Sequence, residues 1–286
     1  MKRRILTALL LVPPAIYLVG WSPKWLLAAA VMTAAEMCLY EYFQLCPPAA
    51  GSPALQALAY GAVAALCLLR ALDTGRAERC TLLLLVLIVL ATLSLALAST
   101  RELKDYLTAV STTIVGVFYT GLALSCLLSL RYSCLGARAL GLDAAASASC
   151  GRNLLFMLLL VIWADDTFAY FVGRAVGRRK LFPAISPKKT LEGSMAGLTG
   201  GVLVAWAFAR LFWKTADLTT VILLAGLVAL VGQIGDLVES AMKRGANLKD
   251  SGSVLPGHGG VLDRLDSLLF GAPVLWLALA VMDFWR

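Results

Sequence analysis

Long apolar runs recur along the whole 286-residue chain, and they limit its fold more than any other feature. Each run has about 17 residues or more, which is enough to cross a hydrocarbon core of about 30 Å as an α-helix. Because 60% of the residues are hydrophobic and only 15% are charged, a water-soluble domain would not have enough interior to bury this surface. The sequence therefore predicts an all-α, polytopic integral membrane helical bundle.

About nine transmembrane helices are expected from the hydrophobic pattern. They lie at roughly 5–21, 25–46, 54–72, 81–99, 107–130, 153–173, 195–213, 218–238 and 267–284. The first resembles a signal peptide, but the Pro13-Pro14 pair and its bulky exit favour a retained helix. We expect a scaffold of about five spans in 1–150 and a second region, 151–286, with two long polar loops, 174–194 and 239–266.

The distribution of the 25 Lys and Arg residues predicts the orientation in the membrane. More of them fall at the N-terminus and in the even-numbered loops than elsewhere, so these parts are expected in the cytoplasm. Both long polar loops then lie on the cytoplasmic side of a multi-pass protein of the cell membrane. The net charge of +8 suits anionic lipid headgroups or anionic substrates, and no nucleic-acid partner is expected.

Carboxylates occur inside three of the predicted spans, where charged side chains are costly and usually functional. Asp165 and Asp166 lie in the sixth span, and Asp236 lies near the end of the eighth. Asp165 and Asp236 would lie roughly 13 Å and 10 Å from the basic ends of their helices, at a similar depth. We therefore expect a polar active-site cavity that opens to the cytoplasm. For Glu36 and Glu41, in the second span, ion pairing with Lys or Arg within the bundle is an equally good interpretation.

Three aspartates are candidates for binding a metal ion. Asp263 and Asp266 share one face if the chain is helical there, and Asp236 completes the set. Aspartates without neighbouring thiols or several histidines suit a hard cation such as Mg²⁺ better than zinc. Ion pairing with basic residues is the alternative.

The loop at 174–194 contains a candidate phosphate site. Ser186 is a good N-cap and Pro187 suits a first helical turn, so Lys188, Lys189 and Thr190 are expected at a helix N-terminus. Backbone N–H groups and two ammonium groups at that position would bind phosphate. A basic loop of this kind can also simply determine the topology.

The loop at 239–266 combines cations, carboxylates and glycines. Gly257, Gly259 and Gly260 allow the backbone to approach a ligand closely, and His258, the only histidine, lies among them. A lone histidine is more often structural than catalytic and does not define a metal site. The combination suits a polyphosphate with its metal ion.

Several motifs together resemble one known family. They are Ser240-Ala-Met-Lys-Arg, Lys249-Asp250, the run Pro256-Gly-His-Gly-Gly-Val-Leu-Asp-Arg-Leu-Asp266, Asp165-Asp-Thr-Phe-Ala-Tyr-Phe-Val-Gly173 and Ser186-Pro-Lys-Lys-Thr-Leu-Glu-Gly193. This pattern is similar to the signature of the phosphatidate cytidylyltransferases, or CDP-diacylglycerol synthases, and it covers the C-terminal half. The N-terminal half matches only as a hydrophobic bundle.

The resemblance implies that CTP and phosphatidate give CDP-diacylglycerol and pyrophosphate in phospholipid biosynthesis. It also implies a requirement for Mg²⁺, with a second metal ion left open, and a commonly dimeric membrane fold. The reaction brings together two anions, so metal ions and basic residues must screen their repulsion and align them.

On this basis each candidate residue is given a role. The expected metal ligands are Asp236, Asp263 and Asp266. The expected phosphate and substrate contacts are Lys188, Lys189, Thr190, Lys243, Arg244 and Lys249, with Asp165 and Asp166 shaping the metal or lipid site. Asp250 belongs to the catalytic segment, His258 either contacts pyrophosphate or holds its loop, and Arg264 either binds phosphate or pairs with Asp263 and Asp266.

Two other functions remain possible interpretations of the sequence. A CTP-dependent isoprenoid-alcohol kinase would use the same nucleotide, although the complete Leu262-Asp-Arg-Leu-Asp266 signature speaks against it. A membrane transporter would also carry intramembrane carboxylates, but it would not explain the glycine-histidine loop, and no inverted repeat is evident.

Overall fold

The structure is a computed structural model that describes residues 13–47, 52–72, 77–100, 102–133, 135–143, 149–252 and 259–285. Within these ranges, eight helices are long and apolar enough to cross a membrane. They are Lys24–Leu45, Pro53–Leu72, Arg79–Ser99, Leu103–Tyr132, Cys150–Val176, Leu191–Phe212, Leu218–Gly245 and Leu262–Phe284. These spans confirm the second to ninth predicted ones, and the protein is a multi-pass membrane bundle. Of the first predicted span, 5–21, the part at 13–20 is helical and the part before residue 13 lies outside the described residues.

The chain forms two compact units, and each is built from two separate segments. The first unit comprises Met1–Ser129 and Met242–Arg264, and the second comprises Leu130–Ala241 and Leu265–Arg286. Two helices, α11 (Leu218–Gly245) and α12 (Leu262–Phe284), contribute residues to both units. The division into a scaffold at 1–150 and a catalytic region at 151–286 stays a prediction about function.

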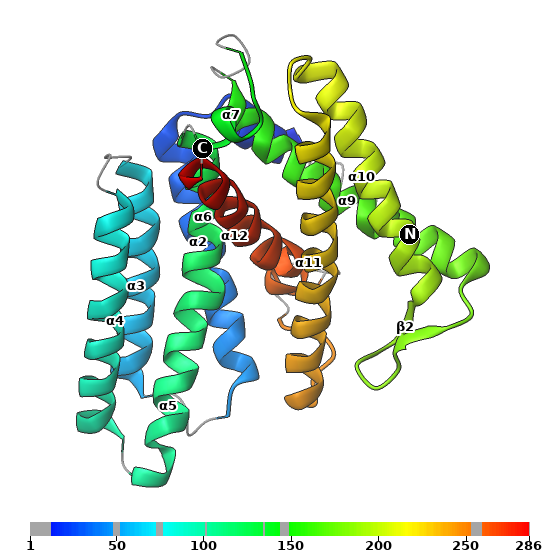
Figure 1. Ribbon diagram of the computed structural model, residues 1–286. Coiled ribbons are helices and arrows are strands. Elements are labelled where there is room, and N and C mark those ends of the chain that lie inside the picture. Colours follow the sequence, from blue (N-terminus) through cyan, green and yellow to red (C-terminus); the bar gives the residue numbers. More distant parts are fainter. Residues whose placement is uncertain are drawn as a thin grey trace. The chain divides into compact units, whose positions relative to one another are not determined.

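The first unit is a bundle in which apolar helices that follow one another in the sequence pack side by side (Figure 1). Its elements are α2 (Lys24–Leu45), α3 (Pro53–Leu72), α4 (Ala77–Ser99), α5 (Leu103–Gly116), the π-helical segment η2 (Val117–Leu122) and the first part of α6 (Ala123–Tyr132). Leu55, Ala96, Ala109 and Val110 form a buried cluster where α3, α4 and α5 meet. Burial of apolar side chains between helices that are themselves apolar all round is the pattern expected in a membrane.

The second unit is organised by close packing of α9 (Cys150–Val176) against α10 (Leu191–Phe212). Small residues on α10 make the close approach possible. A Cβ atom at Gly193 would lie 2.7 Å from the carbonyl oxygen of Ala169, and one at Gly197 would lie 2.7 Å from the carbonyl oxygen of Asp165. The short helix α7 (Leu135–Ala139) also packs on α9. Glycines thus let two helices of a membrane protein approach backbone to backbone.

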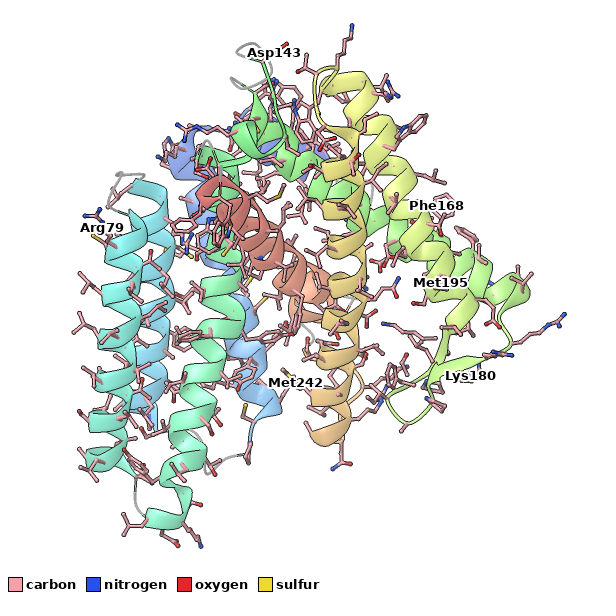
Figure 2. The ribbon with its side chains drawn as sticks, in the orientation of Figure 1. Arg79, Asp143, Phe168, Lys180, Met195 and Met242 are labelled. Carbon is pink, nitrogen blue, oxygen red and sulfur yellow. The ribbon has the colours of Figure 1, made fainter. Side chains whose placement is uncertain are left out.

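Large apolar side chains are exposed on the surface of α9 and α10. Phe168 and Met195, labelled in Figure 2, are 44% and 59% exposed. In a helix long and apolar enough to span a bilayer, exposed side chains of this kind suit contact with lipid tails.

A short hairpin between α9 and α10 corrects one local prediction. Strand β1 (Lys180–Phe182) pairs antiparallel with β2 (Ser186–Thr190), so the bundle also contains a two-stranded sheet. The prediction that Ser186 is a helix N-cap, with Lys188 and Lys189 at the helix N-terminus, is wrong, because Ser186 pairs with Phe182 and both lysines belong to strand β2. The N-cap of α10 is Thr190, whose hydroxyl accepts a hydrogen bond from the N–H of Gly193. The N-cap of α10 therefore lies four residues later than predicted, because the residues from Ser186 onward form a strand.

Candidate active site

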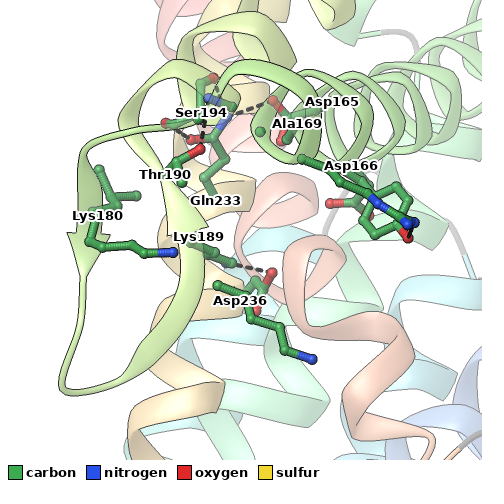
Figure 3. Close-up of a pocket in the computed structure, with 16 residues that line it drawn as sticks. Asp165, Asp166, Ala169, Lys180, Lys189, Thr190, Ser194, Gln233 and Asp236 are labelled. Carbon is green, nitrogen blue, oxygen red and sulfur yellow. Dashed lines mark hydrogen bonds and ion pairs between the residues drawn. The ribbon is translucent and has the colours of Figure 1, made fainter.

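A cavity of about 690 Å³ lies within the second unit, where the end of α9, the hairpin, the start of α10 and the middle of α11 meet (Figure 3). Six predicted site residues line it. They are Asp165, Asp166, Lys188, Lys189, Thr190 and Asp236. The structure thus brings carboxylates from two helices and the basic loop together around one cavity.

Asp165 is held in the cavity wall by a neutral hydrogen-bond donor. Asp165 is only 4% exposed, and the side-chain amide of Gln233 donates a hydrogen bond to its Oδ1 atom over 2.7 Å. The same amide nitrogen donates to the carbonyl oxygen of Ser194 over 3.0 Å, and the Ser194 hydroxyl donates to the amide oxygen of Gln233. The network joins α9, α10 and α11 and fixes the direction of the Asp165 carboxylate.

Asp236 forms an ion pair with a lysine of the hairpin. The Nζ atom of Lys189 lies 2.5 Å from Oδ2 of Asp236, and their side chains are 28% and 29% exposed (Figure 3). Because both groups still reach solvent, the pair can open without burying an isolated charge. An anionic ligand would therefore compete with Asp236 for Lys189, and a cation would compete with Lys189 for Asp236.

Further negative charge comes from α12. Asp266 interacts electrostatically with Asp236 and Asp166, which repel it, and with Lys189, which attracts it. Its Oδ1 atom accepts a hydrogen bond from the N–H of Ser267 over 2.7 Å. Carboxylates therefore outnumber the ammonium group with which they interact here.

These residues fit a hard cation by chemistry but do not form a completed metal site. Their donor atoms are carboxylate oxygens, the type that Mg²⁺ prefers. Within the described part of the chain, no group of three Asp, Glu, Cys or His side chains is arranged to hold a metal ion. A cation at Oδ2 of Asp236 would have to replace Lys189 as the partner of that oxygen.

The first unit contains a second group of predicted residues. Lys243 and Asp263 form an ion pair of 2.5 Å between Nζ and Oδ1, and both side chains are largely buried. The Oδ2 atom of Asp263 accepts hydrogen bonds from the backbone N–H groups of Ser251, over 3.0 Å, and Gly260, over 2.8 Å. Asp263 thus ties the segment before α12 to the start of that helix. Both Asp263 and Asp266 belong to α12, which confirms their predicted helical spacing.

The other predicted residues of this segment are more exposed. A guanidinium nitrogen of Arg244 donates to the carbonyl oxygen of Leu248, and Lys249, Asp250 and Arg264 are exposed. His258 lies outside the described residues, so its role stays a prediction.

Several lining residues were missed by the sequence analysis. Besides Gln233 and Ser194, they include Lys180 of the hairpin and Tyr170 and Arg174 of α9. Arg174 donates to the Tyr170 hydroxyl over 3.2 Å. The signal was spacing, because Tyr170 and Arg174 follow Asp166 at successive intervals of four residues, along one face of a helix.

Fold and site together define a class: a multi-pass membrane protein with a cavity lined by lysines and carboxylates. The Cytidylyltransferase family model matches residues 2–282, and the chain belongs to this family. The relationship expected from the sequence motifs is confirmed.

Similar proteins cover the chain only in part. The chain is 46% identical to a phosphatidate cytidylyltransferase from Bacillus subtilis (strain 168) over 137 residues, which is 46% of this chain and 49% of the relative. It is 40% identical to a phosphatidate cytidylyltransferase from Staphylococcus saprophyticus over 150 residues, or 52% of this chain and 56% of the relative. The aligned region thus spans about half the length of the curated relatives that the chain matches.

Proposed function

We propose that the protein is a phosphatidate cytidylyltransferase that converts CTP and phosphatidate into CDP-diacylglycerol and pyrophosphate. The observation that carries the proposal is one cavity lined by three lysines and three aspartates, namely Lys180, Lys188, Lys189, Asp165, Asp166 and Asp236. Membership of the Cytidylyltransferase family and the names of the similar proteins support it.

The chemical step requires alignment of two anions. An oxygen of the phosphatidate phosphate forms a bond to the α-phosphorus of CTP, while the bond from that phosphorus to the oxygen bridging to the β-phosphate breaks. Pyrophosphate leaves with the electron pair of the broken bond. Lys188, Lys189 and Lys180 would bind the phosphates and reduce their mutual repulsion, and Arg174 would add a further guanidinium contact.

Bound Mg²⁺ would supply positive charge between the phosphates and favour departure of pyrophosphate. We propose Asp236 and Asp266 as its ligands, with Asp166 beside them. Asp263 stays a predicted metal ligand because it belongs to the signature; in the first unit its Oδ1 atom is engaged by Lys243.

Opening of the Lys189–Asp236 pair would couple the two kinds of binding. If Lys189 turned to a phosphate, Asp236 would become available to a cation, and each of the two side chains would exchange one partner of opposite charge for another. We further propose that the cavity faces the cytoplasm, where CTP is found, that phosphatidate reaches it from the bilayer of the cell membrane, and that the protein acts as a homodimer.

The proposal is tested with protein purified in detergent and supplied with CTP and phosphatidate. We expect CDP-diacylglycerol and pyrophosphate in equal amounts with Mg²⁺, and neither product after EDTA is added. Formation of CDP and a phosphorylated lipid from an isoprenoid alcohol would identify a lipid kinase instead. Solute uptake into liposomes without any nucleotide product would indicate a transporter.

A further inference from the structure

Glu41 is a fully buried carboxylate in α2, far along the chain from the signature motifs. A charged side chain in a membrane span is tolerated only when other groups compensate for the lost water. The sequence offered ion pairing with Lys or Arg as one interpretation. The structure instead gives Glu41 hydrogen-bond donors from the segment that leads into α12.

Three donors reach this carboxylate within the first unit. Its Oε1 atom accepts from the N–H of Val261 over 2.9 Å, and its Oε2 atom accepts from the N–H of Leu262 over 2.8 Å. The Ser251 hydroxyl donates to Oε2 over 2.8 Å. Because α12 begins at Leu262, both N–H groups belong to the helix start, where they lack intrahelical partners and where the helix dipole favours a negative charge.

Ser251 connects Glu41 to Asp263. The Ser251 hydroxyl also lies 3.1 Å from Oδ2 of Asp263, the same atom that accepts from the N–H groups of Ser251 and Gly260. Asp263 in turn holds Lys243 through its other oxygen. A continuous set of hydrogen bonds and one ion pair therefore runs from Glu41 to both of these signature residues.

The space around Glu41 is too small for additional side chains. A Cβ atom at Gly252 would lie 2.6 Å from Oε1 of Glu41, and one at Gly260 would overlap both Oε2 of Glu41 and the hydroxyl of Ser251. Two glycines thus let the backbone close around the carboxylate from either side of the segment. Such close approach is a specific use of glycine, and it explains why residues without side chains occur at these two positions.

We propose that Glu41 is a positioning residue for cytidylyl transfer, a role that rests on the function proposed above. It does not contact substrate. It fixes the start of α12 and Ser251, and through them it sets the places of Asp263 and Lys243. A charged group supplied by the N-terminal half of the chain is thereby required for the geometry of the C-terminal signature.

The test compares Glu41→Gln with Glu36→Gln, which makes the same change five residues earlier in α2. Glu36 lies near Tyr60 and Cys67 of α3 and serves as the matched control. In Glu41→Gln, an NH₂ group replaces one acceptor and faces donors. We expect kcat to fall by about 10- to 100-fold with less than about a threefold change in the KM for CTP, because misplacement of about 1 Å costs this much. Glu36→Gln should stay within about twofold of the wild type.

Ser251→Ala keeps the experiment decisive if Glu41→Gln does not fold. It removes the bridging hydroxyl and leaves the backbone bond to Asp263, so a well-folded variant with kcat reduced by about fivefold or more supports the proposal. Wild-type kcat in Ser251→Ala, or in folded Glu41→Gln, would overturn it.

Hydrogen exchange separates this proposal from the proposed function. The amides of Val261 and Leu262 should exchange faster in Glu41→Gln than in the wild type and in Glu36→Gln. If the wild type makes no CDP-diacylglycerol, the proposed function fails, while the exchange of these two amides still shows whether Glu41 anchors the helix start. Unchanged exchange would refute the anchoring itself.

Discussion

Replacing Asp236 with Asn separates the chemical role of this carboxylate from its structural role. The substitution keeps the shape of the side chain but removes its charge and its 2.5 Å ion pair with Lys189. Exposed ion pairs contribute about 0–1 kcal/mol, and breaking a buried one costs about 3–5 kcal/mol. Since both side chains retain more than a quarter of their exposure, Lys189 can turn to water. We therefore expect the free energy of unfolding to fall by only about 1–2 kcal/mol.

The effect on activity should be much larger. Loss of the proposed metal ligand, and of a charge near the phosphates, should lower kcat by about 10³-fold, which corresponds to about 4 kcal/mol of transition-state stabilisation. The assay measures CDP-diacylglycerol formation at saturating CTP, beside thermal unfolding of the same preparation in detergent. The melting temperature should fall by only a few degrees, on the order of 2–4 °C per kcal/mol.

A matched control distinguishes this carboxylate from carboxylates in general. Asp283 forms another ion pair of the second unit, with Arg138 at 3.8 Å, so Asp283→Asn makes the same change elsewhere. It should keep activity within about twofold of the wild type. Near-normal turnover in Asp236→Asn would refute the reasoning, as would a loss of activity fully explained by unfolding.

Two further pairs of variants test the packing and capping that shape the cavity. Gly197→Ala should destabilise the protein by about 1–3 kcal/mol, because the new Cβ would lie 2.5 Å from Oδ1 of Asp165; Gly226→Ala, with its nearest contact at 3.7 Å, should be tolerated. The melting temperatures of the two variants test this difference, and equal values would contradict the close packing at Gly197. Thr190→Val should cost about 1 kcal/mol by removing the N-cap of α10, whereas Thr199→Val removes only a mid-helix bond to a backbone carbonyl. Equal stability of the two valine variants in thermal unfolding would show that the cap is dispensable.

The large features of the fold were predictable because they follow from local composition. Each span is a continuous apolar segment, so its existence needs no knowledge of its neighbours. A common depth of Asp165 and Asp236 was predicted from the sequence, since helix rise converts sequence distance into depth. Both residues do line the same cavity.

The features that were not predictable depend on contacts between segments that are distant in the sequence. Ser186 and Thr190 are both acceptable N-caps by residue type, and only pairing of Thr190 with Lys180 across the hairpin decides between them. Glu41 and Ser251 are 210 positions apart, and nothing in the local sequence of either indicates the other. A buried carboxylate shows that a partner must exist, but its identity requires the fold.

The most direct test of the proposed function follows the phosphorus atoms of CTP. The purified protein would be supplied with phosphatidate and Mg²⁺, and with CTP labelled at either the α- or the γ-phosphorus. The account predicts that the α-label enters the lipid product and the γ-label leaves as pyrophosphate, with both transfers lost in Asp236→Asn. Entry of the γ-label into lipid, or no transfer of the α-label by well-folded wild-type protein, would contradict it.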